Sequence, residues 1–289
     1  MKGCARTPGG QVAGPEKVRT SNAVKTPDHS GWGSAPATHR EAIATETAGF
    51  VDVVKGASPA TPVPSCPGWT LLDLVKHTGS VQRWFSALLR QRVQEPPRSR
   101  DVELRLPARE DGYADWLAAS AAEAASTFAT VDPDAPMWAW GADQHARFWV
   151  RRMLFETLMH RVDAELALGL HPVVDRDLAT DGVDEFLVNL PFAAFFAPAV
   201  DNLRGHGETL RFRCADTSGD WLVHLRPDGF DVEPKRGHTE TTMSADVEIH
   251  AAAADLLLLV YGRLDRGSDA FDVRGNEDLL TRWFANSAF

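Results

Sequence analysis

Apolar side chains recur every three or four residues through most of positions 38–190, which is the period of an amphipathic helix. The pattern predicts five helices, at about residues 38–55, 70–90, 111–129, 147–168 and 177–190. Thr70 and Asp73 have the spacing of a capping box, so we expect the second helix to begin there. The connections 61–69 and 91–107 contain proline, which disfavours helix, and Gly169 is placed to end the fourth helix.

The period changes to two near residue 210, which indicates strands with one buried face. Strands are predicted at 210–214, 221–225, 230–233, 245–250 and 271–274, and helices at 251–263 and 277–284. The fold class is therefore an all-α region followed by an α+β region. We expect two domains, a helical bundle over 38–190 and a small α+β domain over 208–289, with 191–207 as the connection.

Charge sets the N-terminal segment apart from the rest of the 289-residue chain. Residues 1–37 carry five basic and two acidic side chains, a local charge of +3, whereas the whole chain has −10 and the remainder therefore −13. The segment is rich in Gly, Pro, Ser and Thr and has no apolar period. Such a composition cannot bury enough apolar surface to offset the entropy of ordering, so a disordered basic extension is predicted.

Composition also excludes several classes of protein. An acidic chain is a poor partner for nucleic acid, because phosphate backbones attract clustered Lys and Arg. No apolar stretch approaches the ~18 residues that a membrane span requires. Three cysteines, at positions 4, 66 and 214, are too few and too scattered for a disulfide framework. We therefore expect a cytoplasmic protein, monomeric or homodimeric, that binds neither nucleic acid nor membrane.

Two ionisable side chains interrupt an apolar face of the fourth predicted helix. Glu156 and His160 are four residues apart, project about 40° from each other, and are flanked by Trp149, Met153 and Met159. Such groups are costly to bury unless they are paired or bind a metal. The opposite side of the helix, which we expect to face water, carries Arg151, Arg161 and Glu165.

His77 lies beside the apolar stripe of the second helix and completes a possible site. If these two helices are neighbours, His77, Glu156 and His160 can converge, as inward-facing Glu and His do in metal-binding bundles. Three protein ligands would leave a coordination position open, as in catalytic sites. Asp163 could accept the second N–H of His160. Without a metal, a helical Glu–His pair and a hydrogen-bonded core histidine explain the same pattern.

Longer segments around these residues resemble the mycothiol-dependent maleylpyruvate isomerase family. The segments are CPGWTLLDLVKHTG (66–79) and FWVRRMLFETLMHRVDAE (148–165), followed by ADV (245–247), DLLLLVYGR (255–263), FDVRGN (271–276) and LLTRWF (279–284). The resemblance covers about residues 38–289. It implies a DinB-like four-helix bundle followed by a small α+β, sterol-carrier-like domain. Two features depart from the family pattern: relatives often have His-Glu where this chain has Phe155-Glu156, and residues 1–37 have no counterpart.

The resemblance also implies a chemistry. His77, Glu156 and His160 occupy the positions of the family's metal ligands, with zinc the usual metal and nickel or iron also compatible. The cofactor would be mycothiol, whose thiolate adds to an electrophilic, anionic substrate. Arg263 occupies the position of a catalytic and cofactor-binding arginine that would hold a carboxylate. Alternatively, Arg263 only contacts carbonyls at the end of a helix.

Other interpretations of the same residues stay open. A metal site that activates a thiol would serve a mycothiol S-transferase as well as an isomerase. A third interpretation is a non-catalytic, metal-containing protein that carries an apolar ligand in its α+β domain. A second active-site arginine is possible in the loop with Arg98, Arg100 and Arg105. Cys66 has no base near it in the sequence, so we interpret it as a structural residue.

Overall fold

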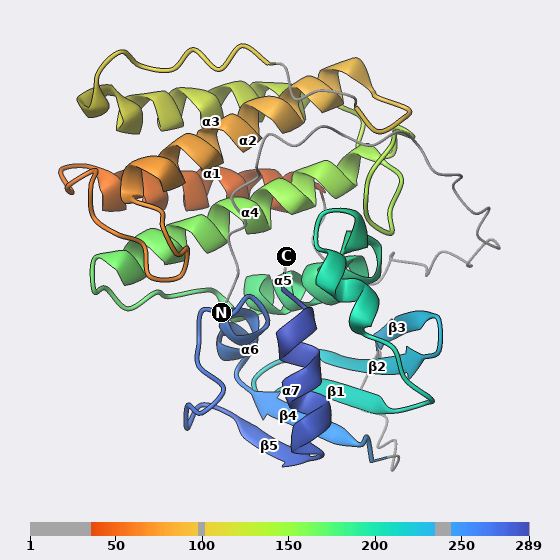
Figure 1. Cartoon of the computed structure of the whole chain (residues 1–289). Coiled ribbons are helices and arrows are strands. Elements are labelled where there is room, and N and C mark those ends of the chain that lie inside the picture. The colour runs from red at the N-terminus through yellow and green to blue at the C-terminus, as the bar shows by residue number, and fades with distance from the viewer. Residues whose placement is uncertain (1–35, 98–101, 235–243, 289) are drawn as a thin grey trace.

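Figure 1 presents the computed structural model, which describes residues 36–97, 102–234 and 244–288. Four long helices form the upper part of the molecule, and a five-stranded sheet with two shorter helices forms the lower part. The predicted fold class, an all-α region followed by an α+β region, is confirmed. The upper helices are α1 (Pro36–Val54), α2 (Leu71–Gln91), α3 (Tyr113–Thr130) and α4 (Ala146–Ala167).

The helix boundaries follow from local sequence signals. α2 begins after Thr70, whose side-chain oxygen accepts the backbone N–H of Asp73, while the Asp73 carboxylate accepts the backbone N–H of Thr70. The predicted capping box is therefore confirmed. α5 (Arg176–Asn189) begins after Asp175, whose carboxylate accepts two backbone N–H groups of the first turn. The first residues of these helices are fixed by side chains that satisfy otherwise unpaired amides.

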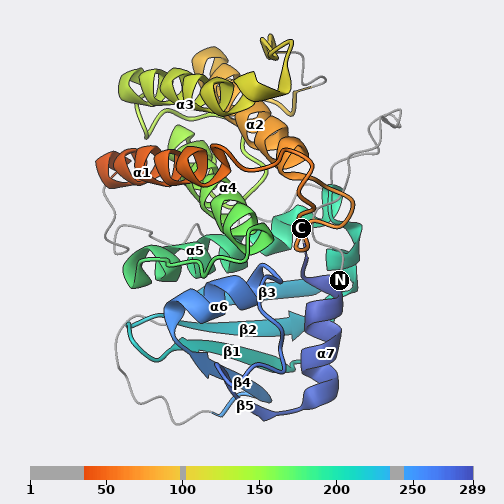
Figure 2. The same cartoon turned by 90° about the vertical axis from the view of Figure 1, so that its left-hand side faces the viewer.

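α4 runs through the middle of the molecule, with α1 and α2 on one side and α5 below it (Figure 2). The prediction that its polar side faces water is wrong. The guanidinium of Arg161 is buried and pairs with Glu46 of α1 and with Glu165, and Arg151 pairs with Asp181 and Asp184 of α5. Neighbouring helices supply the carboxylates, so the charged side of α4 can be covered.

The sheet has the strand order β3-β2-β1-β4-β5. β1 and β4 pair in parallel, with Leu210 opposite Val247, and the other neighbours are antiparallel. Because β1 and β4 are parallel, the chain must cross between them, and β2 and β3 lie within that connection. The strands are β1 (Thr209–Cys214), β2 (Asp220–Arg226), β3 (Gly229–Pro234), β4 (Val247–Ala251) and β5 (Asp272–Gly275).

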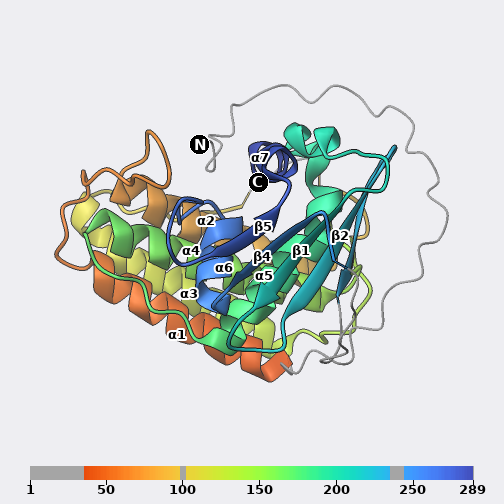
Figure 3. The same cartoon turned by 90° about the horizontal axis from the view of Figure 1, so that it is seen from below.

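One face of the sheet is buried by α6 (Ala253–Val260) and α7 (Glu277–Asn286). Trp283 of α7 is fully buried against Phe212 and Phe230 of that face. In the view from below (Figure 3), the strands lie in front of α5 and α6. The opposite face carries polar side chains, which alternate along the strands with the buried apolar ones.

α5 lies between the upper helices and the sheet, and it packs mainly on α6. Gly182 permits this approach, because a Cβ at that position would lie 2.7 Å from Leu257 of α6 and 2.8 Å from Phe155 of α4. The predicted connection 191–207 contains two 3-10 helices, η2 (Leu190–Phe195) and η3 (Pro198–Asn202). The predicted domain limits at 190 and 208 remain predictions.

Three further predictions concern the N-terminal segment, membrane-spanning helices and the length of one helix. The predicted disordered extension, 1–37, falls almost entirely outside the described residues. Across the described ranges, none of the helices combines the length and the apolar character that a membrane crossing demands. The helix predicted at 251–263 is shorter than expected, because Gly262 adopts φ +71° directly after its C-cap.

Candidate metal centre

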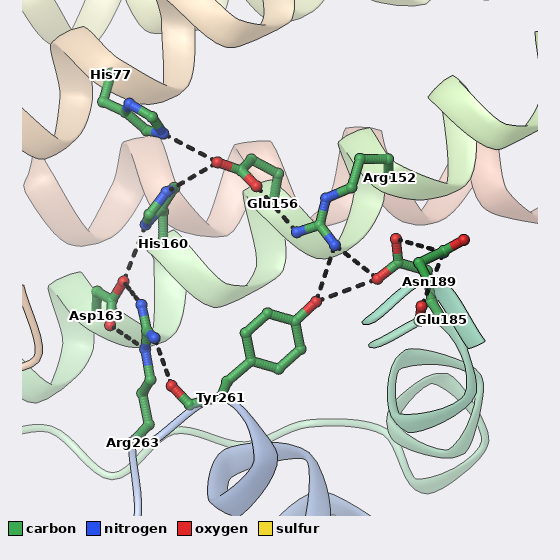
Figure 4. A network of polar contacts seen from close by, with 9 residues as sticks. All are labelled: His77, Arg152, Glu156, His160, Asp163, Glu185, Asn189, Tyr261 and Arg263. Atoms are coloured by element: carbon green, nitrogen blue, oxygen red, sulfur yellow. Dashed lines mark hydrogen bonds and ion pairs between the residues drawn. The ribbon is translucent and has the colours of Figure 1, made fainter. Parts of the chain in front are cut away.

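His77, Glu156 and His160 meet between α2 and α4 (Figure 4). Nε2 of His77 lies 2.9 Å from Oε1 of Glu156, and Nε2 of His160 lies 3.4 Å from the same oxygen. All three donor atoms lie within 4.8 Å of one another. α4 contributes two of them because residues four apart project from one face of a helix. The structure thus brings together the three residues predicted as metal ligands.

The site is buried on one side and accessible on the other. The side chain of His160 is 7% exposed, whereas Glu156 is 23% and His77 is 34% exposed. The indole of Trp69 lies over both imidazoles, with ring centroids 5.0 Å from His77 and 6.3 Å from His160. His77 is therefore the most exposed of the three side chains, and the Trp69 ring packs beside both imidazoles.

Asp163 fixes the orientation of His160. Its Oδ2 lies 2.9 Å from Nδ1 of His160, which confirms the predicted hydrogen bond. When Nδ1 carries the proton that Asp163 accepts, Nε2 presents its lone pair toward Glu156 and His77. Partners of this kind orient the imidazole ligands of metal sites and raise their basicity.

The charges of the site shift two pKa values. Burial alone lowers the pKa of His160, but hydrogen bonds to Asp163 and Glu156 and their negative charges raise it to about 9. Burial opposes ionisation of Glu156, yet hydrogen bonds from His160 and His77 and the charge of Arg152 hold its pKa well below the usual range. At neutral pH Glu156 is therefore a carboxylate, and a metal would have to displace a proton from His160.

Arg263 holds Asp163 from the segment after α6. Its Nε and Nη2 donate to the two oxygens of Asp163 at 2.9 and 2.8 Å, and its Nη1 donates to the carbonyl of Tyr261 at 2.5 Å. Arg263 therefore contacts one carbonyl at the end of α6, as the alternative interpretation has it, but it also pairs with Asp163. The predicted role in binding an anionic cofactor or substrate remains a prediction.

Both halves of the chain match models of one protein family. Residues 40–165 match the mycothiol maleylpyruvate isomerase N-terminal domain, and residues 177–282 match the C-terminal domain of the same family. The chain belongs to the mycothiol-dependent maleylpyruvate isomerase family. The second match begins at residue 177 and so includes α5, which the sequence pattern assigns to the helical bundle.

Solved structures of a family member have the same fold. The mycothiol-dependent maleylpyruvate isomerase aligns with a TM-score of 0.53, and a mutant of it, in which alanine replaces one histidine, aligns with 0.55. Each alignment has 13% sequence identity and covers 83% of this chain and 93% of the other. At this level of sequence identity, the alignments show a shared fold and nothing further. No curated protein is significantly similar to this chain in sequence.

The structure describes only part of the predicted arginine loop, and it buries Cys66. Arg105 is exposed and pairs with Glu103, whereas Arg98 and Arg100 lie outside the described residues. Cys66 is fully buried, with its Sγ 3.5 Å from Oδ2 of Asp163, and its interpretation as a structural residue remains a prediction. A local sequence pattern cannot predict a contact between residues that are 97 positions apart.

Besides Trp69, three residues at the site were missed by the sequence analysis. Arg152 donates to Oε2 of Glu156 at 2.9 Å and, through Nη1, to Glu185 at 2.6 Å and to the Tyr261 hydroxyl at 3.1 Å. The spacing of Arg152 and Glu156 is a detectable signal, because residues four apart form helical ion pairs. No comparable signal identifies Glu185 or Tyr261, which come from α5 and from the C-cap of α6.

Proposed function

We propose that this protein is a metal-dependent enzyme that uses mycothiol, or a similar low-molecular-weight thiol, to attack an electrophilic substrate. The proposal rests on one observation above all: the donor atoms of His77, Glu156 and His160 lie within 4.8 Å of one another in a partly open site. Membership of the isomerase family is consistent with this chemistry.

The three side chains fit a divalent metal. Two imidazole nitrogens and one carboxylate oxygen suit zinc, and also nickel or iron. The oriented imidazole of His160 and the ionised carboxylate of Glu156 support this assignment. A divalent metal held by these residues would lower the pKa of a bound thiol, so that thiolate is available at neutral pH.

The remaining residues have distinct roles in this proposal. Asp163 holds His160, Arg263 holds Asp163, and the ring of Trp69 packs beside both imidazoles. The bidentate pairing of Arg263 with Asp163 favours a role in orienting His160 over direct contact with the substrate. Whether it also stabilises negative charge on the reacting molecule is a separate prediction.

The reaction proposed is addition of the thiolate to an activated carbon–carbon double bond. Rotation about the resulting single bond, followed by elimination of the thiolate, gives the other geometric isomer. In an S-transferase the thiol would stay attached to the product. The mass of the product therefore distinguishes isomerase from transferase with the same purified protein.

Metal analysis combined with thermal denaturation tests the proposal. The purified chain should contain about one divalent ion per protein, and millimolar mycothiol should raise the melting temperature of the metal-loaded form. His77→Ala and His160→Ala should lose the metal. His171→Ala, which removes an exposed histidine outside α4, should retain it. A wild-type protein without metal affinity, or no effect of thiol, would contradict the proposal.

A further inference from the structure

A buried polar chain leads from Glu156 into the C-terminal half of the molecule (Figure 4). Arg152 of α4, Glu185 of α5 and Tyr261 at the end of α6 are 4%, 1% and 8% exposed. Arg152 lies at the centre and contacts the other two, as well as Glu156. Burying a guanidinium is costly, so its partners must be held in place.

The two oxygens of Glu156 are divided between different partners. Oε1 lies toward Nε2 of His77 and of His160, whereas Oε2 accepts a hydrogen bond from Nη2 of Arg152 at 2.9 Å. A carboxylate held on one oxygen cannot rotate freely about its terminal bond. Arg152 therefore presents Oε1 to the two imidazoles in one orientation.

Arg152 itself is held from two further elements. Its Nη1 donates to Oε2 of Glu185 at 2.6 Å and to the hydroxyl of Tyr261 at 3.1 Å, and that hydroxyl donates to the same Glu185 oxygen at 3.2 Å. Glu185 also accepts from the side-chain amide of Asn189, at 3.4 Å. The ring of Tyr261 packs against Phe186, with centroids 4.9 Å apart. The guanidinium is thus fixed by α5 and by the C-cap of α6.

We infer that Arg152 is a positioning residue for the metal ligand Glu156, and that Glu185 and Tyr261 impose this position from the C-terminal half of the chain. The inference rests on the proposed metal site and extends it. Metal affinity then depends on how α5 and the end of α6 pack against α4. A variant in that interface should alter metal binding without touching a ligand.

Arg161 offers a matched comparison on the same helix. Like Arg152, it is buried, pairs with a glutamate four residues later, Glu165, and with a glutamate from another helix, Glu46. None of its glutamate partners belongs to the metal site. Loss of Arg161 therefore reproduces the structural cost of losing a buried arginine, without the effect on Glu156.

The test measures zinc affinity by competition with a chelator in the full-length protein. Arg152→Met should weaken zinc binding by about 10- to 100-fold, Arg152→Lys by less, and Tyr261→Phe by several-fold, whereas Arg161→Met should leave it within about twofold. The visible spectrum of the cobalt-substituted protein should shift in Arg152→Met and Tyr261→Phe only. Denaturation of the metal-free proteins measures the structural cost separately.

The outcomes separate the two proposals. If the wild type has no affinity for zinc, the metal site itself is wrong. If the wild type binds zinc and the Arg152 variants bind it equally well, or if Arg161→Met weakens binding as much as Arg152→Met, the positioning role is wrong. Should Arg152→Met fail to fold, Tyr261→Phe decides, because it removes one hydroxyl and keeps the ring that contacts Phe186. Unchanged zinc affinity and cobalt spectrum in that variant would overturn the inference.

Discussion

Arg263 and Asp163 form a bidentate ion pair across 100 residues of sequence, with Nε–Oδ1 and Nη2–Oδ2 distances of 2.9 and 2.8 Å. Both side chains are buried. Oδ2 of Asp163 also accepts the hydrogen bond from Nδ1 of His160. One carboxylate therefore joins the proposed metal site to the segment that follows α6.

Replacement of this carboxylate should affect both stability and metal binding. In Asp163→Asn the buried guanidinium of Arg263 loses its counter-charge, so the free energy of unfolding of the metal-free protein should fall by about 3 kcal/mol. Zinc affinity should fall at least tenfold, because His160 is no longer held by a carboxylate. Chemical denaturation and chelator competition measure the two effects.

A double variant separates these effects. Asp163→Asn with Arg263→Met removes the unpaired charge, so part of the lost stability should return. Zinc affinity should stay low, because His160 still lacks its partner. Restored zinc affinity in the double variant would show that Asp163 acts through folding alone.

The raised pKa of His160 predicts that the stability of the metal-free protein depends on pH. Its pKa in the folded protein is raised to about 9, above the value of 6.5 for an unperturbed histidine. The stabilisation from its hydrogen bonds is therefore fully present below pH 6.5 and is lost as the pH rises from 6.5 to 9. Denaturation at several pH values should show this loss in the wild type and not in His160→Gln.

The same shift predicts that zinc binding releases a proton. Metal coordination requires neutral His160, which is protonated in the metal-free protein at pH 7.5, so each zinc should release about one proton. Apparent zinc affinity should then rise with pH up to about 9. An indicator dye in weakly buffered solution measures the release, and a flat affinity between pH 7 and 9 would contradict the assignment.

The sequence predicted those parts of the site that depend on helical spacing. Glu156, His160 and Asp163 follow one another on α4, so the period of the helix fixes their relative directions. The error about Arg161 came from the same reasoning, since a polar side of a helix is usually hydrated. Nothing local to Arg161 reveals that Glu46, 115 residues earlier, covers it. Glu185 and Tyr261 were missed because only tertiary packing brings them to Arg152.

Gly182 should not tolerate a methyl group. In the interior of a helix Ala usually stabilises relative to Gly by about 0.5–1 kcal/mol. Here the added Cβ would lie 2.7 Å from Leu257 and 2.8 Å from Phe155, so Gly182→Ala should lower the free energy of unfolding by about 2 kcal/mol instead. Urea denaturation gives the sign, and a stabilised variant would show that α5 can move away from α4 and α6 at little cost.

Thr70 offers a smaller test, at the start of the helix that carries His77. Thr70→Ala removes the side-chain oxygen that accepts the Asp73 amide and should cost about 1 kcal/mol of stability. Thr70→Ser keeps the hydroxyl and should cost much less. Equal losses in the two variants would indicate that the methyl group, rather than the cap, is responsible.

The spacing of the site residues along α4 determines which kinds of mutation in that helix the site can tolerate. Arg152, Glu156, His160 and Asp163 are separated by four, four and three residues, and span about 16 Å of one helix. Helix pitch is set by backbone hydrogen bonds, so a substitution between these four residues leaves their directions unchanged, but the intervening side chains are buried and a large change of volume there costs stability. A single inserted residue, by contrast, turns everything after it by about 100°. Within α4, a change of length should therefore disrupt the geometry of the site, whereas a volume-conserving substitution between its residues should not.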